Sequence, residues 1–84
     1  MDTQALRLLI RRKIWEGRLP PNRLPSVWWG RSKGESCDAC SMMVTRAQVL
    51  MQGTSLAGDV PTQFHVRCFQ IWNDERHTTR KRTT

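Results

Sequence analysis

Two pairs of residues with metal-binding side chains constrain this chain of 84 residues more than any other feature. Two residues separate Cys37 from Cys40, and two residues separate His65 from Cys68. A tight turn with this spacing can point both sulfurs of the first pair at one ion, and positions i and i+3 of a helix lie on one face. Three thiolates and one imidazole form a closed tetrahedral zinc set, with no position left for water or substrate. The pattern therefore predicts one structural Zn²⁺ ion held by these four residues.

Other interpretations of the same residues are weaker. Soft thiolate ligands argue against magnesium or calcium, and three cysteines fit a disulfide framework poorly because one thiol would be left over. Cys37 and Cys40 could form a redox pair, but we expect no sheet of the kind that such a motif needs. His77 is a further possible ligand, yet it lies nine residues beyond Cys68, too far along the same helix to converge on the ion.

The small size of the chain gives the metal a role in folding. Hydrophobic residues make up 38% of the sequence, and a domain of this size buries only about 60% of the surface that its unfolded chain exposes. Structural zinc contributes roughly 10–16 kcal/mol to the folding of finger peptides. We therefore expect a single domain over residues 1–84, in which the zinc-binding module of residues 35–77 does not fold without metal.

Residues 3–16 have the pattern of a basic helix. Asp2 or Thr3 can cap its start, no Pro or Gly interrupts it, and Gly17 stands where a left-handed stop is expected. One line of apolar residues recurs at helical spacing, and a second line runs beside it. The first line is Leu6, Leu9, Ile10 and Ile14, and the second is Leu8 and Trp15. So broad an apolar face predicts that the helix packs against the rest of the chain or against another chain.

A proline-rich sequence predicts an extended segment over residues 18–34. The tripeptide Arg-Leu-Pro occurs twice in it, and proline restricts both itself and the residue before it. We expect this segment to wrap around the domain and to end in a polar turn over residues 30–34. Trp28 and Trp29 are adjacent in extended chain, so their side chains point to opposite sides. One of them can pack on the core while the other faces water or a ligand.

The remaining sequence predicts a short β-hairpin followed by a second helix. Strands are expected over residues 48–52 and 60–64, joined by a loop over residues 53–59. The helix is expected over residues 65–77, with Phe69 and Trp72 on its apolar face and residues 74–76 pointing outward. Residues 78–84 are short, polar and basic, and we expect them to be disordered. The fold class is thus a small α+β domain stabilised by zinc, with an N-terminal helix, an extended segment, a zinc knuckle, a hairpin and a C-terminal helix.

The order of these elements resembles a treble-clef zinc finger, in which a Cys-x-x-Cys knuckle and a hairpin precede a helix that carries the second ligand pair. The wider pattern also resembles small uncharacterised bacterial zinc-finger proteins, from about residue 5 to residue 76. The shared stretches are Gly17-Arg18-Leu19-Pro20 after a basic helix, a Trp-Gly-x-Gly-type stretch before the knuckle, and Phe64-His65-Val66-Arg67-Cys68-Phe69-Gln70-Ile71-Trp72. The resemblance implies the fold and the zinc ligands but no function. Between Met42 and Val60 the chain departs from the pattern, because a hairpin expected to be acidic is here rich in Met, Gln and Ser.

Positive charge is concentrated at the two ends of the chain. The sequence has 14 Lys and Arg against 7 Asp and Glu, a net charge of +7, while residues 35–75 are mildly acidic. Basic ends favour polyanionic partners, nucleic acid or anionic lipid, with solubility alone as the alternative. Phosphate contacts would give affinity with little sequence specificity, and a tryptophan could stack on an unpaired base. The candidate nucleic-acid-binding residues are Arg7, Arg11, Arg12, Lys13, Arg18, Arg23, Trp28, Trp29, Arg31, Lys33, Arg80, Lys81 and Arg82.

Protein binding is the alternative function. Treble-clef fingers are common scaffolds for protein contacts, and the apolar face of the N-terminal helix could dock on a partner. We expect no catalysis and no small-molecule substrate, since no acid–base or nucleophile pair is evident and His65 is already assigned to the metal. No stretch has the length of a membrane span or a secretory signal, so we expect a reducing cytoplasm and no membrane partner.

Overall fold

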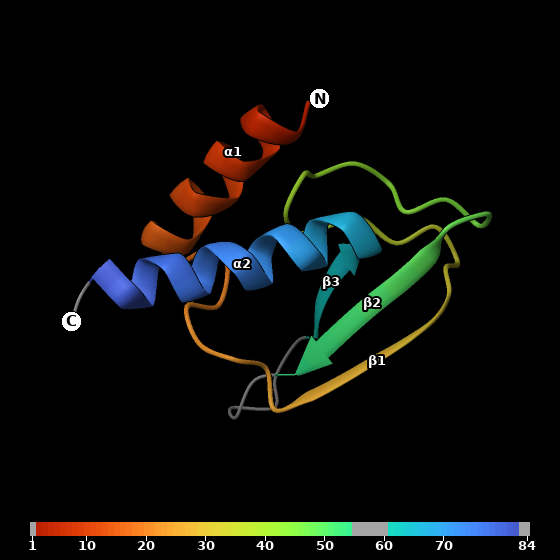
Figure 1. Cartoon of the computed structure of the whole chain (residues 1–84). Coiled ribbons are helices and arrows are strands. Elements are labelled where there is room, and N and C mark those ends of the chain that lie inside the picture. Colours follow the sequence, from red (N-terminus) through yellow and green to blue (C-terminus); the bar gives the residue numbers. More distant parts are fainter. Residues whose placement is uncertain (1, 55–60, 83–84) are drawn as a thin grey trace.

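A three-stranded antiparallel sheet and two helices make up the domain (Figure 1). The computed structural model describes residues 2–54 and 61–82. The elements in chain order are α1 (Thr3–Trp15), β1 (Ser26–Arg31), β2 (Val49–Thr54), β3 (Thr62–His65) and α2 (Val66–Arg82). β2 is the central strand and pairs with both β1 and β3. The structure therefore confirms a small α+β domain that begins and ends with a helix.

α1 is the helix that the sequence predicts, and it ends one residue earlier than expected. The Asp2 carboxylate accepts a hydrogen bond from the Ala5 N–H at 2.7 Å and so caps the first turn. Gly17, just beyond the helix, has a φ of 76°, a left-handed conformation that glycine adopts without a steric penalty. Leu6, Ile10 and Ile14 of the first apolar line are buried, whereas Leu8 and Trp15 of the second line are exposed. The helix thus packs against the rest of the chain through its first apolar line.

β1 lies within the extended wrapping segment predicted over residues 18–34 and adds a third strand to the predicted hairpin. This strand pairs with β2 along its whole length. The prolines explain why the strand covers only part of the segment, because Pro20, Pro21 and Pro25 keep residues 18–25 irregular by lacking a backbone donor. Residues 26–31 all have an N–H group, and Val, Trp and Trp favour strands. The proline-rich character therefore ends at the start of β1.

β2 and β3 form the predicted hairpin with shifted ends. The strands span Val49–Thr54 and Thr62–His65, in place of residues 48–52 and 60–64. Residues 55–60, which hold most of the expected loop and the first residue of the expected second strand, lie outside the described residues. Gly53 belongs to β2, where a Cβ atom would stand 3.2 Å from the Cβ of Leu24. A glycine at this position lets the irregular segment before β1 close over the sheet.

α2 begins one residue later than predicted and extends further. His65 is the last residue of β3, and the helix continues beyond His77 to Arg82, where we predict a disordered tail. Residues 74–76 do not all point outward either, because Glu75 and Arg76 are buried. α1 packs against α2 and binds Glu75 through Arg7 and Arg11, while Arg76 lies over the Trp72 ring of its own helix. The helix is longer and more enclosed than its polar sequence indicates.

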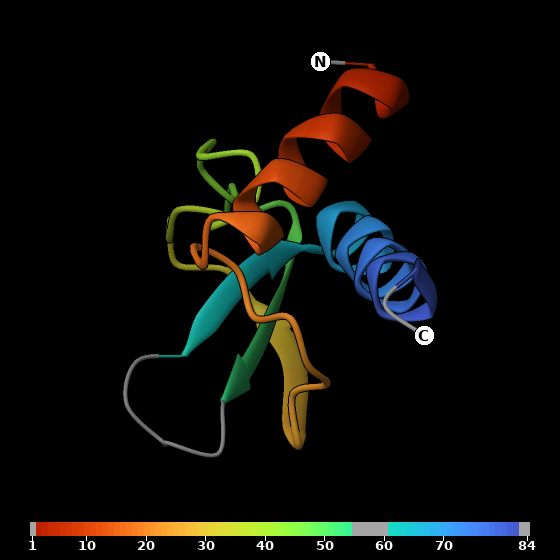
Figure 2. The same cartoon turned by 90° about the vertical axis from the view of Figure 1, so that its left-hand side faces the viewer.

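The core joins both helices to one side of the sheet (Figure 2). Phe64 of β3 packs against the rings of Phe69 and Trp72 of α2, with ring centroids 5.8 and 5.3 Å away. The indole N–H of Trp72 donates a hydrogen bond to the Pro20 carbonyl at 2.9 Å, which ties the proline segment to α2. The inner face of α1 belongs to the same buried cluster as Cys37 and Cys68. The N-terminal helix is therefore an integral part of the module that carries the four candidate ligands.

Candidate metal centre

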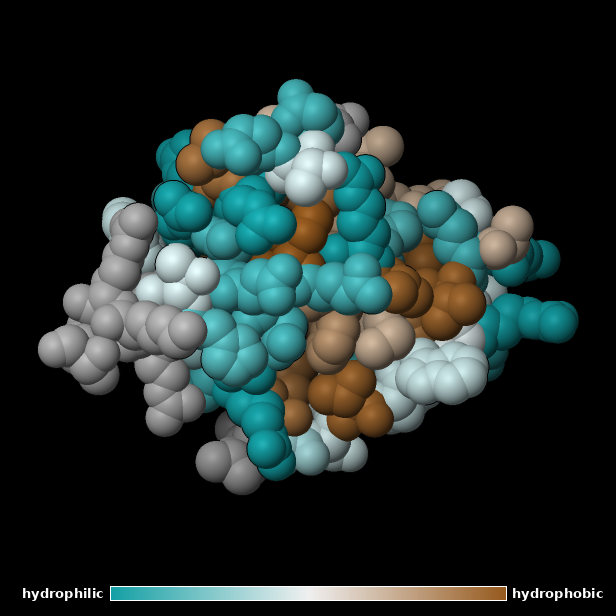
Figure 3. Space-filling view, viewed as in Figure 1, coloured by the Kyte–Doolittle hydropathy of each residue, from teal (hydrophilic) through white to brown (hydrophobic). Residues whose placement is uncertain are grey.

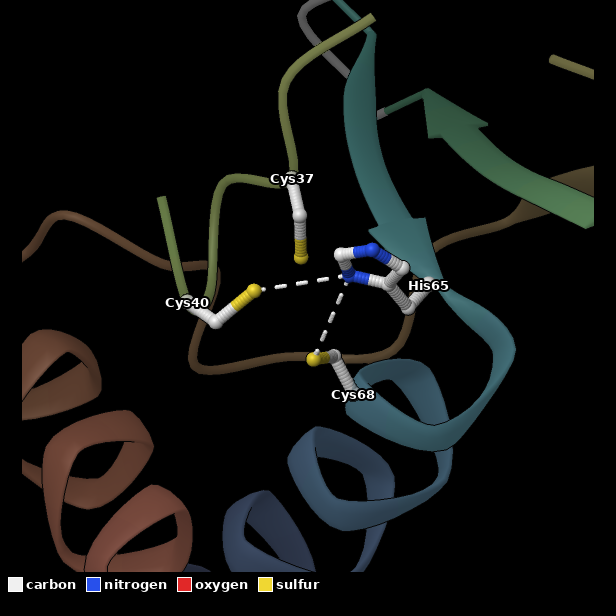
Figure 4. A group of neighbouring side chains, drawn as sticks. All are labelled: Cys37, Cys40, His65 and Cys68. Atoms are coloured by element: carbon white, nitrogen blue, oxygen red, sulfur yellow. Dashed lines mark hydrogen bonds between the residues drawn. The ribbon is translucent and has the colours of Figure 1, made fainter. Parts of the chain in front are cut away.

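The first ligand pair lies on a tight turn between β1 and β2. The Ser41 N–H donates to the Cys37 carbonyl at 2.9 Å, and the Cys37 N–H donates to the Met42 carbonyl at 2.8 Å. Ser41 has a φ of 66°, the left-handed conformation that lets the chain reverse direction here. This turn points the sulfurs of Cys37 and Cys40 to the same side (Figure 4). The spacing of two residues thus produces the knuckle that the sequence predicts.

Asp38 fastens the knuckle to β3. Its N–H donates to the Gln63 carbonyl at 2.8 Å, and its carboxylate accepts from the Gln63 N–H at 2.7 Å. Because Gln63 is two residues before His65, these bonds fix the distance between the first ligand pair and the imidazole. Asp38 was not among the residues predicted from the sequence, although its place between the two cysteines could have indicated it.

The four predicted ligands meet at one point. The donor atoms of Cys37, Cys40, His65 and Cys68 all lie within 4.8 Å of one another. The Nδ1 atom of His65 is 3.4 Å from the Cys40 sulfur and 3.8 Å from the Cys68 sulfur. Zn–S bonds of about 2.3 Å and Zn–N bonds of about 2.0 Å in a tetrahedron place the donors about 3.5–3.8 Å apart. The cluster has the size and the donor set of a zinc site.

The tautomer of His65 suits metal binding. Its Nε2 atom lies 3.1 Å from the Met43 carbonyl oxygen, which can only accept a hydrogen bond. The proton of a neutral imidazole is then on Nε2, and the lone pair of Nδ1 faces the three sulfurs. Metal-binding histidines commonly donate their second ring N–H to such an outer partner. Met43 is thus a second contributor that the sequence analysis missed, since its backbone carbonyl acts and not its side chain.

Burial and mutual hydrogen bonds shift the pKa values of the three thiols in different directions. The Cys68 thiol, together with the backbone N–H groups of Cys40, His65 and Ala39, lowers the pKa of Cys37 to about 4, although burial opposes this change. The same contact with Cys37, and then burial, raises the pKa of Cys68, while burial chiefly raises that of Cys40. Three adjacent thiolates repel one another, so a divalent cation is what allows all three to ionise.

The basic residues of α1 that were candidates for nucleic-acid binding already have partners in the domain. Arg7 and Arg11 bind the buried Glu75 carboxylate at 3.0 and 2.7 Å. Lys13 is 4% exposed and donates hydrogen bonds to the knuckle. Arg12 and Arg18 form exposed ion pairs with Glu16. The structure thus gives the strongest predicted basic cluster a structural role.

A second basic cluster lies at the end of β1. A groove of about 770 Å³ is lined by Trp29, Arg31 and Lys33 from one side and by Arg46 from the other. All four side chains are exposed, and in the described part of the chain no carboxylate forms an ion pair with these three cations. Trp28 and Trp29 lie on opposite faces of β1 and are 51% and 71% exposed, so neither packs in the core. Arg46 was not among the predicted residues, and the chain reversal before β2 brings it to this groove.

The other residues predicted from the sequence to bind nucleic acid or metal lie in the segment before β1 and on α2. Arg23 is exposed in the segment before β1. Arg80, Lys81 and Arg82 lie on the last turn of α2, and their side chains are outside the described residues. His77, the alternative metal ligand, places Nδ1 2.8 Å from the Asn73 carbonyl of its own helix and is not part of the cluster. The four original ligands are therefore the ones that converge.

An apolar groove of about 840 Å³ runs beside the metal centre. Its walls include the side chains of Met42, Met43, Val49 and Val66, which are 65%, 60%, 43% and 37% exposed. Figure 3 shows hydrophobic surface gathered around the start of α2 and bordered by hydrophilic side chains. The apolar side chains of this groove are thus exposed to solvent beside the four candidate ligands.

Two further searches, one for membrane-spanning helices in the described residues and one for similar proteins, gave negative results. No helix in the described residues is long and apolar enough to cross a membrane. Comparison with protein-family models, with curated proteins and with solved structures gives no match.

Proposed function

We propose that this chain is a structural zinc protein with a treble-clef-like arrangement of ligands. The observation that carries the proposal is the convergence of Cys37, Cys40, His65 and Cys68 within 4.8 Å, with the imidazole lone pair facing the sulfurs. Two ligands come from a knuckle, one from the end of β3 and one from the first turn of α2. Bound zinc would supply folding free energy and no open coordination position. The three thiolates require a reducing compartment such as the cytoplasm.

Two histidine variants test the zinc site. His65→Ala removes one donor, whereas His77→Ala removes a histidine that lies away from the cluster and serves as the matched control. Native mass spectrometry of freshly reduced protein should show one zinc ion in the wild type and in His77→Ala, and little or none in His65→Ala. Equal zinc content in the two variants, or a wild type without metal, would refute the site.

We propose in addition that the zinc-stabilised domain binds single-stranded nucleic acid at the groove beside β1. The support is the combination of an exposed aromatic ring, Trp29, with three exposed cations, Arg31, Lys33 and Arg46, that line the same groove. Base stacking on an exposed aromatic ring contributes about 1–3 kcal/mol per base, and cations that track the backbone add affinity without sequence specificity. The surface differs from the α1 surface that the charge pattern favours, because the α1 cations are engaged within the domain.

Two tryptophans with similar exposure give a matched test of this surface. Trp29 is 71% exposed at the groove, and Trp15 is 67% exposed on α1. Binding of a labelled random-sequence single strand should weaken about tenfold in Trp29→Ala and remain unchanged in Trp15→Ala, as measured by fluorescence anisotropy. Arg46→Gln should lower the slope of log affinity against log salt by about 0.7, and Arg12→Gln should not. Equal losses in the two tryptophan variants would contradict the groove.

Protein binding is a second candidate, favoured by the apolar groove beside the metal centre. Its exposed methionines are flexible and adapt to different partner surfaces. This candidate gains weight if the zinc-loaded protein fails to bind single-stranded DNA and RNA at low salt. An amphipathic peptide partner should then lose affinity on Val49→Glu, which places a charge in the groove, while Trp29→Ala leaves its affinity unchanged.

A further inference from the structure

Lys13 is a buried cation that binds the knuckle from outside. The side chain belongs to α1 and is 4% exposed. Its Nζ atom donates hydrogen bonds to the carbonyl oxygens of Asp38 at 3.0 Å and Ala39 at 2.7 Å, and to the Ser41 hydroxyl at 3.2 Å. Lysine is almost never so buried unless it is paired, yet all three of these acceptors are uncharged. A compensating negative charge is therefore expected close to this ammonium.

The peptide groups of the knuckle connect Lys13 to the Cys37 sulfur. The Asp38 carbonyl and the Ala39 N–H are the two ends of one peptide group, and the Ala39 carbonyl and the Cys40 N–H are the ends of the next. The two carbonyls accept from Lys13, and the backbone groups of Cys40 and Ala39 are among those that lower the pKa of Cys37. Hydrogen bonds in such a chain polarise one another. The ammonium therefore polarises the two peptide groups that join Cys37 to Cys40 through its bonds to their carbonyls.

The proposed zinc cluster would carry a net negative charge beside the Lys13 ammonium. Zn²⁺ with three thiolates and a neutral imidazole has a net charge of −1. The ligand shell is partly buried, since Cys37 and Cys68 are 1% and 3% exposed. A buried charge of this kind is costly unless a neighbouring group offsets it. Lys13 is the cation that the described part of the chain holds against the knuckle.

We infer that Lys13 is a positioning residue of the metal centre, which offsets the charge of the bound cluster and couples the docking of α1 to metal binding. This inference rests on the proposed zinc site. It gives the N-terminal helix a task that its amphipathic pattern does not reveal. Outer partners of metal ligands typically change metal affinity about 10- to 100-fold when they are removed, and the same range is expected here.

Three lysine variants separate the charge from the hydrogen bonds. Lys13→Met removes both, Lys13→Gln removes the charge and keeps an N–H donor, and Lys33→Met removes an exposed lysine as the control. Zinc affinity, measured by competition with a chelator, should fall about 10- to 100-fold in Lys13→Met and less in Lys13→Gln, with no change in Lys33→Met. Ile14→Val loosens the packing of α1 without touching Lys13, and it should change the affinity much less than Lys13→Met.

The Co²⁺-loaded protein provides a readout that a merely structural role would not move. The thiolate-to-cobalt charge-transfer band should shift in both Lys13 variants and keep its wild-type position in Ile14→Val and Lys33→Met. If Lys13→Met does not fold even with metal, Lys13→Gln carries the comparison. Wild-type affinity and an unshifted band in Lys13→Gln and Lys13→Met would overturn the inference while leaving the zinc site intact. A wild type that binds neither Zn²⁺ nor Co²⁺ would instead overturn the zinc proposal itself.

Discussion

Two glutamates, each bound by two arginines, offer a direct test of how burial sets the strength of ion pairs in this fold. Glu75 links α2 to α1 by accepting from Arg7 at 3.0 Å and Arg11 at 2.7 Å, and its side chain is 3% exposed. Glu16 binds Arg12 at 3.1 Å and Arg18 at 3.6 Å, but its side chain is 41% exposed. The chemistry is the same, so a difference in stability has to come from the surroundings.

The structure sets the expected size of the effect of Glu75→Gln. A hydrogen bond to a charged group contributes about 1.5–3 kcal/mol to stability. The glutamine carbonyl still accepts from one arginine, while its amide group faces the other without a bond. The side chains of Arg7 and Arg11 are 32% and 28% exposed, so water compensates part of the loss. We expect a decrease of about 2 kcal/mol in the free energy of unfolding, and no measurable decrease for Glu16→Gln.

Thermal unfolding of the zinc-loaded protein at neutral pH and fixed excess zinc measures this difference. For a domain of this size, about 2 kcal/mol corresponds to a melting temperature lower by about 10 °C. A double-mutant cycle of Glu75→Gln with Arg11→Met should show a coupling energy of about 1 kcal/mol or more. Equal stability losses in Glu75→Gln and Glu16→Gln would refute the reasoning, because burial would then have no influence on the pair.

Four further predictions concern the pH dependence of zinc binding, the pH dependence of stability, the sheet and the knuckle. Zinc binding requires deprotonated thiols and a neutral imidazole, so apparent affinity should fall as the pH drops below neutrality, with release of zinc followed by a colorimetric chelator. Burial alone would raise the pKa of Glu75, but hydrogen bonds from Arg11 and Arg7 outweigh burial and keep that pKa below its usual value. The contribution of the ionised Glu75 to the free energy of unfolding is therefore present above pH about 4.3 and is lost as the pH falls below it. Gly53→Ala would press a methyl group against Leu24 and should cost about 1–3 kcal/mol in urea unfolding, whereas Gly30→Ala, with 3.7 Å to the Trp28 ring, meets only ordinary contact. Cys40→Ser should abolish the dispersed NMR spectrum of the folded domain in the same way as a chelator, and a spectrum unchanged by either would show that the apolar core suffices.

Local spacing was enough to predict the ligand cluster, because a turn and a helix start each bring residues three positions apart together. The two ends of α1 were also predicted from local signals, the Asp2 cap and the Gly17 stop. β1 was missed because its pairing partner, β2, lies about 20 residues further along the chain, and nothing within residues 26–31 signals which strand they join. The outer partners of the metal centre were missed for a related reason. The Met43 carbonyl acts through the backbone, which no residue type reveals.

The charge pattern shows most clearly where a sequence misleads. Eight basic residues in the first 34 positions favour an external polyanion, yet the α1 cations among them bind Glu75, Glu16 and the knuckle carbonyls. A helix whose cations are engaged within its own domain would have to weaken those contacts to bind phosphates, and if both Arg7 and Arg11 turned away the buried Glu75 carboxylate would be left unpaired. Removal of one partner from such a pair is far more costly than loss of an exposed one. This is why we propose the end of β1 as the nucleic-acid surface, because Arg31, Lys33 and Arg46 could meet phosphates there without disturbing the contact between the two helices.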